Sequence, residues 1–93
     1  MAFVYVLRCR DGSLYTGWTD DLERRMRAHE AGKASKYTRS RRPVSLAAWF
    51  VLDDQSSARS LEARFKRLTR SQKIAALAAR QAFGIAMHKA RTL

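Results

Sequence analysis

The sequence contains one cysteine, one proline and only four glycines among its 93 residues. The single cysteine, Cys9, allows no internal disulfide, so we expect a cytoplasmic protein without a disulfide-linked partner. One cysteine and two well-separated histidines, His29 and His88, cannot supply the ligands of a structural zinc site. No apolar run approaches the roughly 18 residues that a membrane span requires, and the N-terminus lacks the features of a signal peptide. These absences predict a protein that does not contact the membrane.

Acidic residues are also scarce, since eight Asp and Glu stand against 19 Lys and Arg, a formal net charge of +11. Residues 33–42 contain five basic groups and no acid, and the chain beyond Glu62 contains eight basic groups and no acid. Fourteen of the basic residues are arginine, which binds phosphate through two parallel hydrogen bonds. This composition predicts a nucleic acid as the partner. A small basic ribosome- or nucleoid-associated protein would have the same composition, so charge alone indicates no chemistry.

The length predicts one small domain that covers residues 1–93, and a hydrophobic content of 46 % is typical of a globular chain. Residues 3–8, 14–18 and 44–52 are rich in β-branched, aromatic and other apolar side chains, and we expect each to form a strand. The turn signal Asp11-Gly12-Ser13 separates the first two strands and predicts a hairpin.

The length of the hairpin turn decides where Tyr5 and Tyr15 point. A strict two-residue turn at Asp11-Gly12 would place the two tyrosines on opposite faces of the sheet. An odd-numbered loop, such as Asp11-Gly12-Ser13 with a bulge, would place both hydroxyls on one face. A shared active site requires the second arrangement.

A first helix is expected to follow the hairpin. Asp20 is a suitable N-cap with Glu23 as its reciprocal partner, and Gly32 is a suitable C-terminal stop. Leu22 and Met26, four residues apart, then form its core face. Residues 33–43 are polar and basic and end at the single proline, which predicts a loop with room for one helical turn.

Further helices are expected over 58–68 and from Thr69 onward, where Gln72 completes a capping box, with an interruption at Gly84. Leu61, Phe65 and Leu68 are spaced to form the core face of the first of these helices, and Ile74, Leu77 and Ala78 lie on the second. The order β-β-α-β-α-α predicts an α+β fold with a small antiparallel or mixed sheet flanked by helices.

Two groups of side chains are candidates for chemistry on phosphate. Arg25 and His29 are four residues apart and lie on one face of the first helix, where a guanidinium can hold charge and an imidazole can move protons. Glu62 is the last acid in the chain and stands among basic residues, as a ligand for a hard cation would. The alternatives are a solvated basic helix and an ordinary ion pair of Glu62 with Lys66.

These motifs in this order resemble the GIY-YIG nuclease family. The resemblance rests on Val4-Tyr5-Val6, on Tyr15-Thr16-Gly17 ten residues later, on Asp21-Leu22-x-x-Arg25-x-x-x-His29 and on Glu62. The segment from Gly32 to Val44 and the later Lys66-x-Leu68-x-Arg70-x-x-Lys73 resemble the small single-domain bacterial branch of that family. The resemblance covers residues 3–75 and leaves 76–93 as a C-terminal helix or tail. Val4 and Thr16 replace the glycine and isoleucine of the two motif triplets.

The resemblance implies a three-stranded antiparallel sheet flanked by helices and a metal-dependent endonuclease. Such an enzyme would hydrolyse phosphodiester bonds in DNA, with RNA as a further possibility, at weak sequence specificity in repair or recombination. Carried over by position, Tyr5, Tyr15, Arg25, His29 and Glu62 are the implied catalytic residues, with Glu62 as the single protein ligand of one Mg²⁺ or Mn²⁺ and Gly17 as the motif glycine. The implied nucleic-acid-binding residues are Lys33, Lys36, Tyr37, Arg39, Arg41, Arg42, Lys66, Arg70 and Lys73.

Three questions stay open at the level of sequence. Tyr5 or Tyr15 is the favoured general base, and His29 is the alternative proton carrier. A degenerate relative that binds nucleic acid with little catalytic activity would share most of these residues. The protein is expected to be a monomer or a weak dimer.

Overall fold

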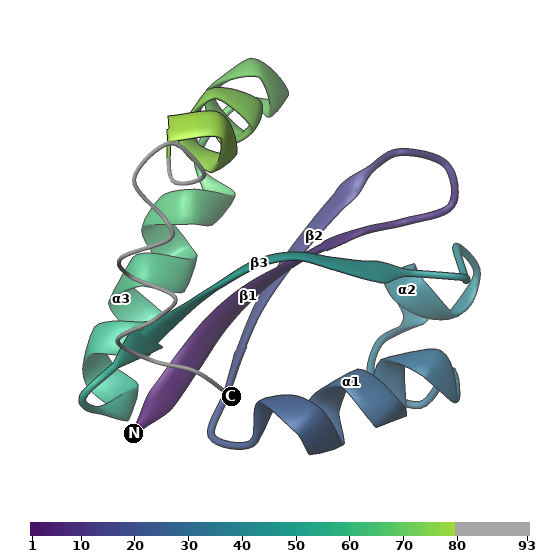
Figure 1. Cartoon of the computed structure of the whole chain (residues 1–93), viewed down its shortest axis with the longest axis horizontal. Coiled ribbons are helices and arrows are strands. Elements are labelled where there is room, and N and C mark those ends of the chain that lie inside the picture. Colours follow the sequence, from purple (N-terminus) through teal and green to yellow (C-terminus); the bar gives the residue numbers. More distant parts are fainter. Residues whose placement is uncertain (80–93) are drawn as a thin grey trace.

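The computed structural model describes residues 1–79, and its centre is a three-stranded antiparallel sheet (Figure 1). The first strand in the chain is the middle strand of the sheet, and it is buried along almost its whole length. The predicted α+β class and the three-stranded antiparallel sheet are confirmed. The strands are β1 (Ala2–Arg8), β2 (Leu14–Thr19) and β3 (Ser45–Leu52), in the spatial order β2-β1-β3.

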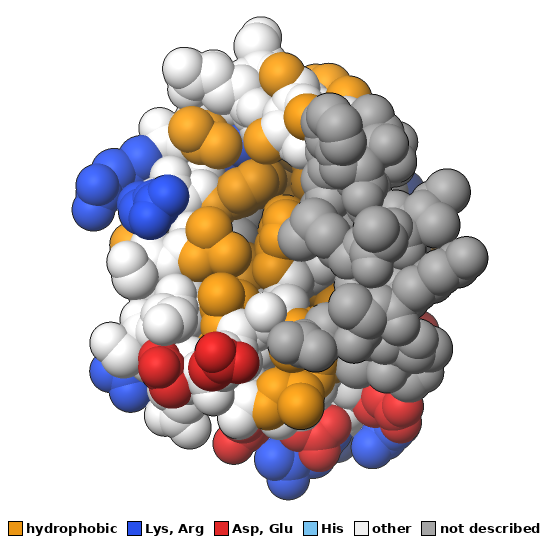
Figure 2. All heavy atoms as spheres, turned by 60° about the vertical axis from the view of Figure 1, so that its left-hand side comes forward, with side chains coloured by type: hydrophobic (Ala, Val, Ile, Leu, Met, Phe, Trp, Pro, Cys, Tyr) orange, Lys and Arg blue, Asp and Glu red, His pale blue; other side chains and the backbone are white. Residues whose placement is uncertain are grey.

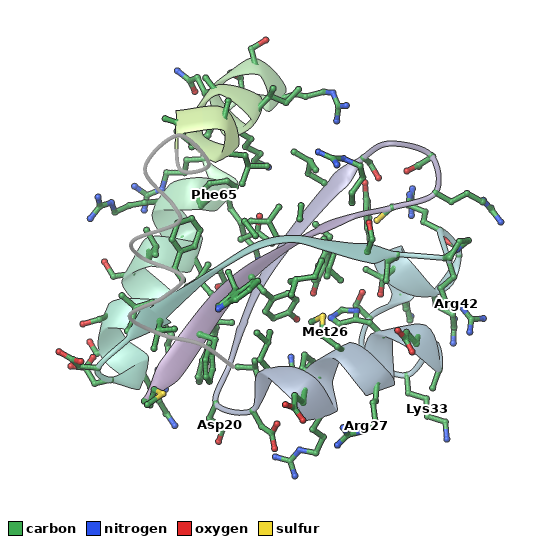
Figure 3. The ribbon with its side chains drawn as sticks, viewed as in Figure 1. Asp20, Met26, Arg27, Lys33, Arg42 and Phe65 are labelled. Carbon is green, nitrogen blue, oxygen red and sulfur yellow. The ribbon has the colours of Figure 1, made fainter. Side chains whose placement is uncertain are left out.

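Helices cover both faces of this sheet, because alternate residues of β1 point to opposite sides. Tyr5 belongs to the cluster that Leu22 of the first helix completes, whereas Val4 packs with Ala58 on the other side. Phe65 also lies between its helix and the sheet (Figure 3). The helices are α1 (Leu22–Glu30), the one-turn α2 (Lys36–Arg39) and α3 (Gln55–Lys66), followed by helical residues 70–79.

The β1–β2 hairpin has the odd-numbered loop that a shared active site requires. Tyr5 pairs with Gly17 and Leu7 pairs with Tyr15, so both tyrosines project from the same face. The strict two-residue turn is therefore excluded. The carboxylate of Asp11 stabilises the loop, because it accepts the backbone N–H of Ser13 at 3.0 Å and the Nε–H of Arg41 at 3.1 Å.

The prediction that Asp20 caps α1 is wrong by one residue. Strand β2 continues to Thr19, so Asp20 occupies the connecting turn and Asp21 takes the extended backbone of the N-cap. The Asp21 carboxylate accepts the backbone N–H of Arg24 at 3.0 Å. The expected core face is confirmed, since Leu22 is buried and Met26 points from α1 toward the sheet (Figure 3).

Gly32 ends α1 as expected. Its φ of +76° is the left-handed conformation that glycine adopts without steric cost. The N–H of Gly32 donates to the carbonyl of His29, and the N–H of Lys33 donates to that of Ala28, at 3.1 and 2.8 Å. These two bonds form a Schellman motif, which satisfies carbonyls that the helix end would otherwise leave unpaired.

Helix α3 begins three residues earlier than the expected position 58, because Asp54 caps it by accepting the N–H of Ser57 at 2.7 Å. The capping box at Thr69 is confirmed, with reciprocal bonds to Gln72 of 2.9 and 3.2 Å. Of the apolar residues expected on the last helix, Leu77 is buried, whereas Ile74 and Ala78 are exposed. Gly84 lies outside the described residues.

The described part of the chain has no helix long and apolar enough to cross a membrane. On the face shown in Figure 2, hydrophobic side chains occupy the middle and acidic side chains lie toward its lower end. The excess of positive charge is therefore not concentrated on that face.

Candidate active site

The Tyr5 side chain is fully buried and extends from β1 across its neighbour in β2, Gly17. A Cβ atom at position 17 would lie only 2.5 Å from the Tyr5 hydroxyl oxygen. Glycine inside a strand often marks a place where another group approaches the backbone closely. What approaches is a phenol, and the missing side chain makes room for it.

A chain of buried hydrogen bonds begins at this hydroxyl. The Tyr5 oxygen lies 2.8 Å from Nε2 of His29, and Nδ1 of the same imidazole lies 2.8 Å from Oγ1 of Thr38. Thr38 in turn lies 2.9 Å from the hydroxyl of Ser35, the N-cap of α2. A neutral imidazole donates from one nitrogen and accepts at the other, so the Thr38 bond and the Tyr5 bond are linked.

Thr38 was not among the residues predicted from the sequence. It is fully buried, although it belongs to a polar and basic segment that was expected to be a loop with room for one helical turn. The one available signal is its spacing from Ser35, because Ser at an N-cap accepts the N–H of the third residue beyond it. That signal predicts a helical turn and gives no indication of contact with His29.

Burial keeps both ends of the Tyr5–His29 hydrogen bond uncharged near neutral pH. Loss of hydration, followed by the charge of Tyr15, raises the pKa of Tyr5 from 10.0 to about 12. Loss of hydration, followed by the charge of Arg25, lowers the pKa of His29 from 6.5 to about 4. Arg25 partly offsets the shift at Tyr5, where it lowers the pKa. The pair is suited to orient a reacting group and not to hold a charge.

Tyr15 is half-buried and lies in a cluster of rings. Its ring centroid is 6.4 Å from that of Tyr5 and 5.4 Å from that of His29, which it meets edge-on. Tyr37 of α2 stacks on it at 5.9 Å, and the guanidinium of Arg41 lies over the Tyr37 ring, 3.8 Å from its centroid. Within the described chain the Tyr15 hydroxyl has no hydrogen-bond partner, so it is available to a substrate or water.

Arg25 and Glu62 supply the two permanent charges of this site. Arg25 is half-buried on the same helical face as His29, and its charge influences the pKa values of both His29 and Tyr5. Glu62, on α3, has a side chain that is 20 % exposed and lies 3.6 Å from the Lys66 ammonium. The negative charge of Glu62 is also one cause of the raised pKa of Tyr5. Glu62 therefore lies within electrostatic range of the tyrosine while it forms the ordinary ion pair considered above.

Glu62 is the one carboxylate associated with this site, and residues 1–79 contain no group of three or more His, Cys, Asp or Glu side chains that could enclose a metal. This donor set does not fit a cage built wholly from protein ligands. It fits Mg²⁺, which often takes one or two carboxylates and completes its octahedron with waters and substrate phosphate oxygens.

The basic residues expected to contact nucleic acid fall into two groups. Several have partners within the protein: Arg41 binds Asp11, Arg42 donates to the carbonyls of Arg39 and Glu30, Arg70 donates to the carbonyl of Gly12, and Lys66 pairs with Glu62. Over the described range, the side chains of Lys33, Lys36, Arg39 and Lys73 form no ion pair or hydrogen bond.

Comparison with known proteins places this arrangement in a family. The model of the GIY-YIG catalytic domain matches residues 1–75. UPF0213 proteins of Streptococcus pyogenes serotypes M5 and M2 are each 54 % identical over 81 residues, which cover 86 % of this chain and 88 % of theirs. The solution NMR structure of the UPF0213 protein BH0048 from Bacillus halodurans is 40 % identical, with a TM-score of 0.58 and 85 % coverage of both chains. The chain therefore belongs to the GIY-YIG family, a family of nucleases.

Proposed function

We propose that this protein is a metal-dependent endonuclease that hydrolyses phosphodiester bonds in DNA with weak sequence specificity. The observation that carries the proposal is the contact between Tyr5 and His29 at 2.8 Å next to Gly17, with Arg25 and Glu62 close enough for their charges to influence the pKa of Tyr5. Hydrolysis of a phosphodiester needs a water-activating group, a cation for the growing negative charge and a ligand for a divalent ion. The residues of this site supply all three.

Each side chain has a role that follows from its burial and charge. Arg25 binds a non-bridging phosphate oxygen and neutralises the charge that develops on phosphorus. Tyr15, half-buried and without a hydrogen-bond partner in the described chain, would accept the proton of the attacking water as a phenolate, after its own hydroxyl proton has passed to solvent. Tyr5 and His29 remain neutral and orient the water or the phosphate, because burial opposes a charge on either.

Glu62 is the residue that would hold Mg²⁺ or Mn²⁺. When bound, such an ion stabilises phosphate oxygens as a Lewis acid and lowers the pKa of nearby acids. Glu62 is paired with Lys66, whose side chain is 52 % exposed and can therefore move into solvent when an ion binds the carboxylate.

A second candidate function is nucleic-acid binding with little catalysis. The ion pair of Glu62 with Lys66 and the raised pKa of Tyr5 favour it, since the first occupies the metal ligand and the second leaves little Tyr5 phenolate to act as a base near neutral pH. The basic side chains without an ion pair or hydrogen bond in the described chain, such as Lys36 and Arg39, would bind nucleic acid in either case.

Cleavage of supercoiled plasmid and branched DNA with Mg²⁺ or Mn²⁺ tests the two candidates. We expect the wild-type protein to cut, and Glu62→Gln to reduce the rate by about 10²-fold or more, since loss of one transition-state electrostatic contact has that size. Glu23→Gln is the matched control, because Glu23 is an exposed glutamate in the first turn of α1, and it should cut at the wild-type rate.

Equal cutting by the wild type and Glu62→Gln would contradict the metal assignment. Absence of cutting by the wild type with every ion, together with DNA binding, would favour the second candidate.

A further inference from the structure

Two adjoining cavities lie around α2 and share Arg39. The first, of about 480 Å³, is lined in part by Arg10, Glu30 and Arg42, and the second, of about 470 Å³, in part by Lys33 and Lys36. We propose that these cavities form one site for a backbone phosphate of the DNA strand, separate from the phosphate that is cleaved. The proposal rests on the proposed function, which identifies the ligand as a DNA strand. It adds the path that this strand follows beyond the cleaved phosphate.

The charges around the cavities are not neutralised by the protein. Within residues 1–79, the side chains of Arg39, Lys33 and Lys36 have no ion pair or hydrogen bond, and the side chain of Arg10 makes a single 3.4 Å bond to the carbonyl of Ser40. Glu30 is the one acid in the lining. Like charges gathered around a hollow repel one another, and a bound phosphate relieves that repulsion.

The backbone that carries these cations is held rigidly. Arg42 joins the end of α1 to α2, because its Nη1 donates to the carbonyl of Glu30 and its Nε to that of Arg39, both at 3.0 Å. Its guanidinium lies directly over Gly32, where an added Cβ would be 3.0 Å from Cζ. Thr38 holds the same turn through His29. The backbone that carries the unpaired cations is thus held in place, which limits how far Lys33, Lys36 and Arg39 can move from the cavities.

Helix α2 separates these cavities from the tyrosines. Tyr37 and Thr38 face the catalytic side, where they contact Tyr15 and His29, whereas Lys36 and Arg39 line the cavities. An α-helix with its side chains is about 10 Å wide, so one phosphate cannot occupy both places. A strand bound at the tyrosines must pass α2 to reach Arg39.

The lining favours the sugar–phosphate backbone over a base. It contains no aromatic side chain on which a base could stack, and its charged members are mostly cations. Phosphate contacts fix the position of a strand without reading its sequence, which agrees with the weak specificity proposed above.

Metal-free binding tests this site without any need for catalysis. Fluorescence anisotropy in EDTA would measure the affinity of a labelled 20-nucleotide DNA for the wild type and for Arg39→Gln and Lys36→Gln. We expect each variant to bind about tenfold more weakly, with a salt dependence reduced by about one counterion. Arg27→Gln is the control, because Arg27 points away from the sheet on the outer side of α1 (Figure 3). This variant should change the affinity and its salt dependence less than the other two.

A second measurement locates the phosphate on the strand. A single neutral methylphosphonate, moved one linkage at a time away from the cleaved bond, should weaken wild-type binding at one position and leave Arg39→Gln unaffected there. Circular dichroism would check that the variants are folded.

Arg39→Gln and Lys36→Gln binding DNA as tightly as Arg27→Gln would overturn the proposal. If free dAMP displaced the labelled oligonucleotide at concentrations close to the oligonucleotide's own dissociation constant, the cavities would be a mononucleotide pocket and the proposal would be overturned. If the wild type cuts no DNA but Arg39→Gln still weakens binding, the phosphate site stands and the nuclease proposal fails. If the wild type cuts DNA but Arg39→Gln and Lys36→Gln bind it normally, the nuclease proposal stands and the phosphate site fails.

Discussion

The ring of Tyr37 stacks on the ring of Tyr15, with centroids 5.9 Å apart and planes inclined by 26°. The guanidinium of Arg41 also lies over the Tyr37 ring and is paired with Asp11 in the hairpin loop. The Tyr37 ring is therefore held against Tyr15, although 37 % of the residue is exposed. This arrangement favours a role in positioning Tyr15 over the contact with nucleic acid that the sequence suggested.

Substitution of Tyr37 separates these two roles. Tyr37→Ala should lower kcat about tenfold or more and change KM little, because a displaced Tyr15 would misalign the reacting groups. Tyr37→Phe keeps the ring and should restore the wild-type rate. Steady-state cleavage of an oligonucleotide gives both constants, and a raised KM at unchanged kcat would instead indicate that Tyr37 binds the strand.

The buried His29 should make the fold sensitive to acid. Its pKa is lowered from 6.5 to about 4 by burial and by Arg25, so the unfolded chain binds a proton that the folded protein resists. The contribution of His29 to the free energy of unfolding is fully present above pH 6.5 and is lost as the pH falls toward 4, by at most about 3 kcal/mol.

Urea unfolding at several pH values would measure this dependence. His29→Gln cannot take up the proton, so its free energy of unfolding should fall less steeply over the same range. Parallel pH profiles for the wild type and His29→Gln would contradict the lowered pKa.

Gly17→Ala should damage both stability and catalysis. The new methyl group would lie 2.5 Å from the Tyr5 hydroxyl, so the phenol must move away from His29. We expect a loss of about 1–3 kcal/mol in the free energy of unfolding, as for other overpacked core sites, and a reduced cleavage rate.

Gly12→Ala provides the comparison for that variant. Gly12 has a φ of +83° and open space around its Cα, so alanine there adds backbone strain of about 1–2 kcal/mol without touching the site. It should lose stability and keep its activity. Equal activity of the two variants in their folded states would show that the Tyr5 position does not matter for cleavage.

Local signals in the sequence predicted much of the fold. The strands, the stop at Gly32 and the capping box at Thr69 each depend on a few neighbouring residues, and the structure has all of them. The N-cap at Asp21 in place of Asp20 was missed because two adjacent aspartates carry the same local signal, and the length of β2 decides between them.

Contacts between distant residues could not be predicted in this way. The hairpin loop depends on Arg41, which lies 30 residues from Asp11, and the bond from Thr38 to His29 spans two helices. The sequence named Tyr5, His29 and Glu62 by their resemblance to a motif. It could not indicate that burial keeps Tyr5 and His29 neutral, because the shifts in their pKa values come from packing in the folded protein.

The middle position of β1 has a consequence for assembly of the site. Tyr5 lies in a strand that pairs with β3, its hydroxyl contacts His29 of α1, and its pKa is influenced by Glu62 of α3. The hairpin loop is held at Gly12 by Arg70 as well. The site therefore draws on segments spread from β1 to Arg70, so its parts come together only when the described fold is formed as a whole.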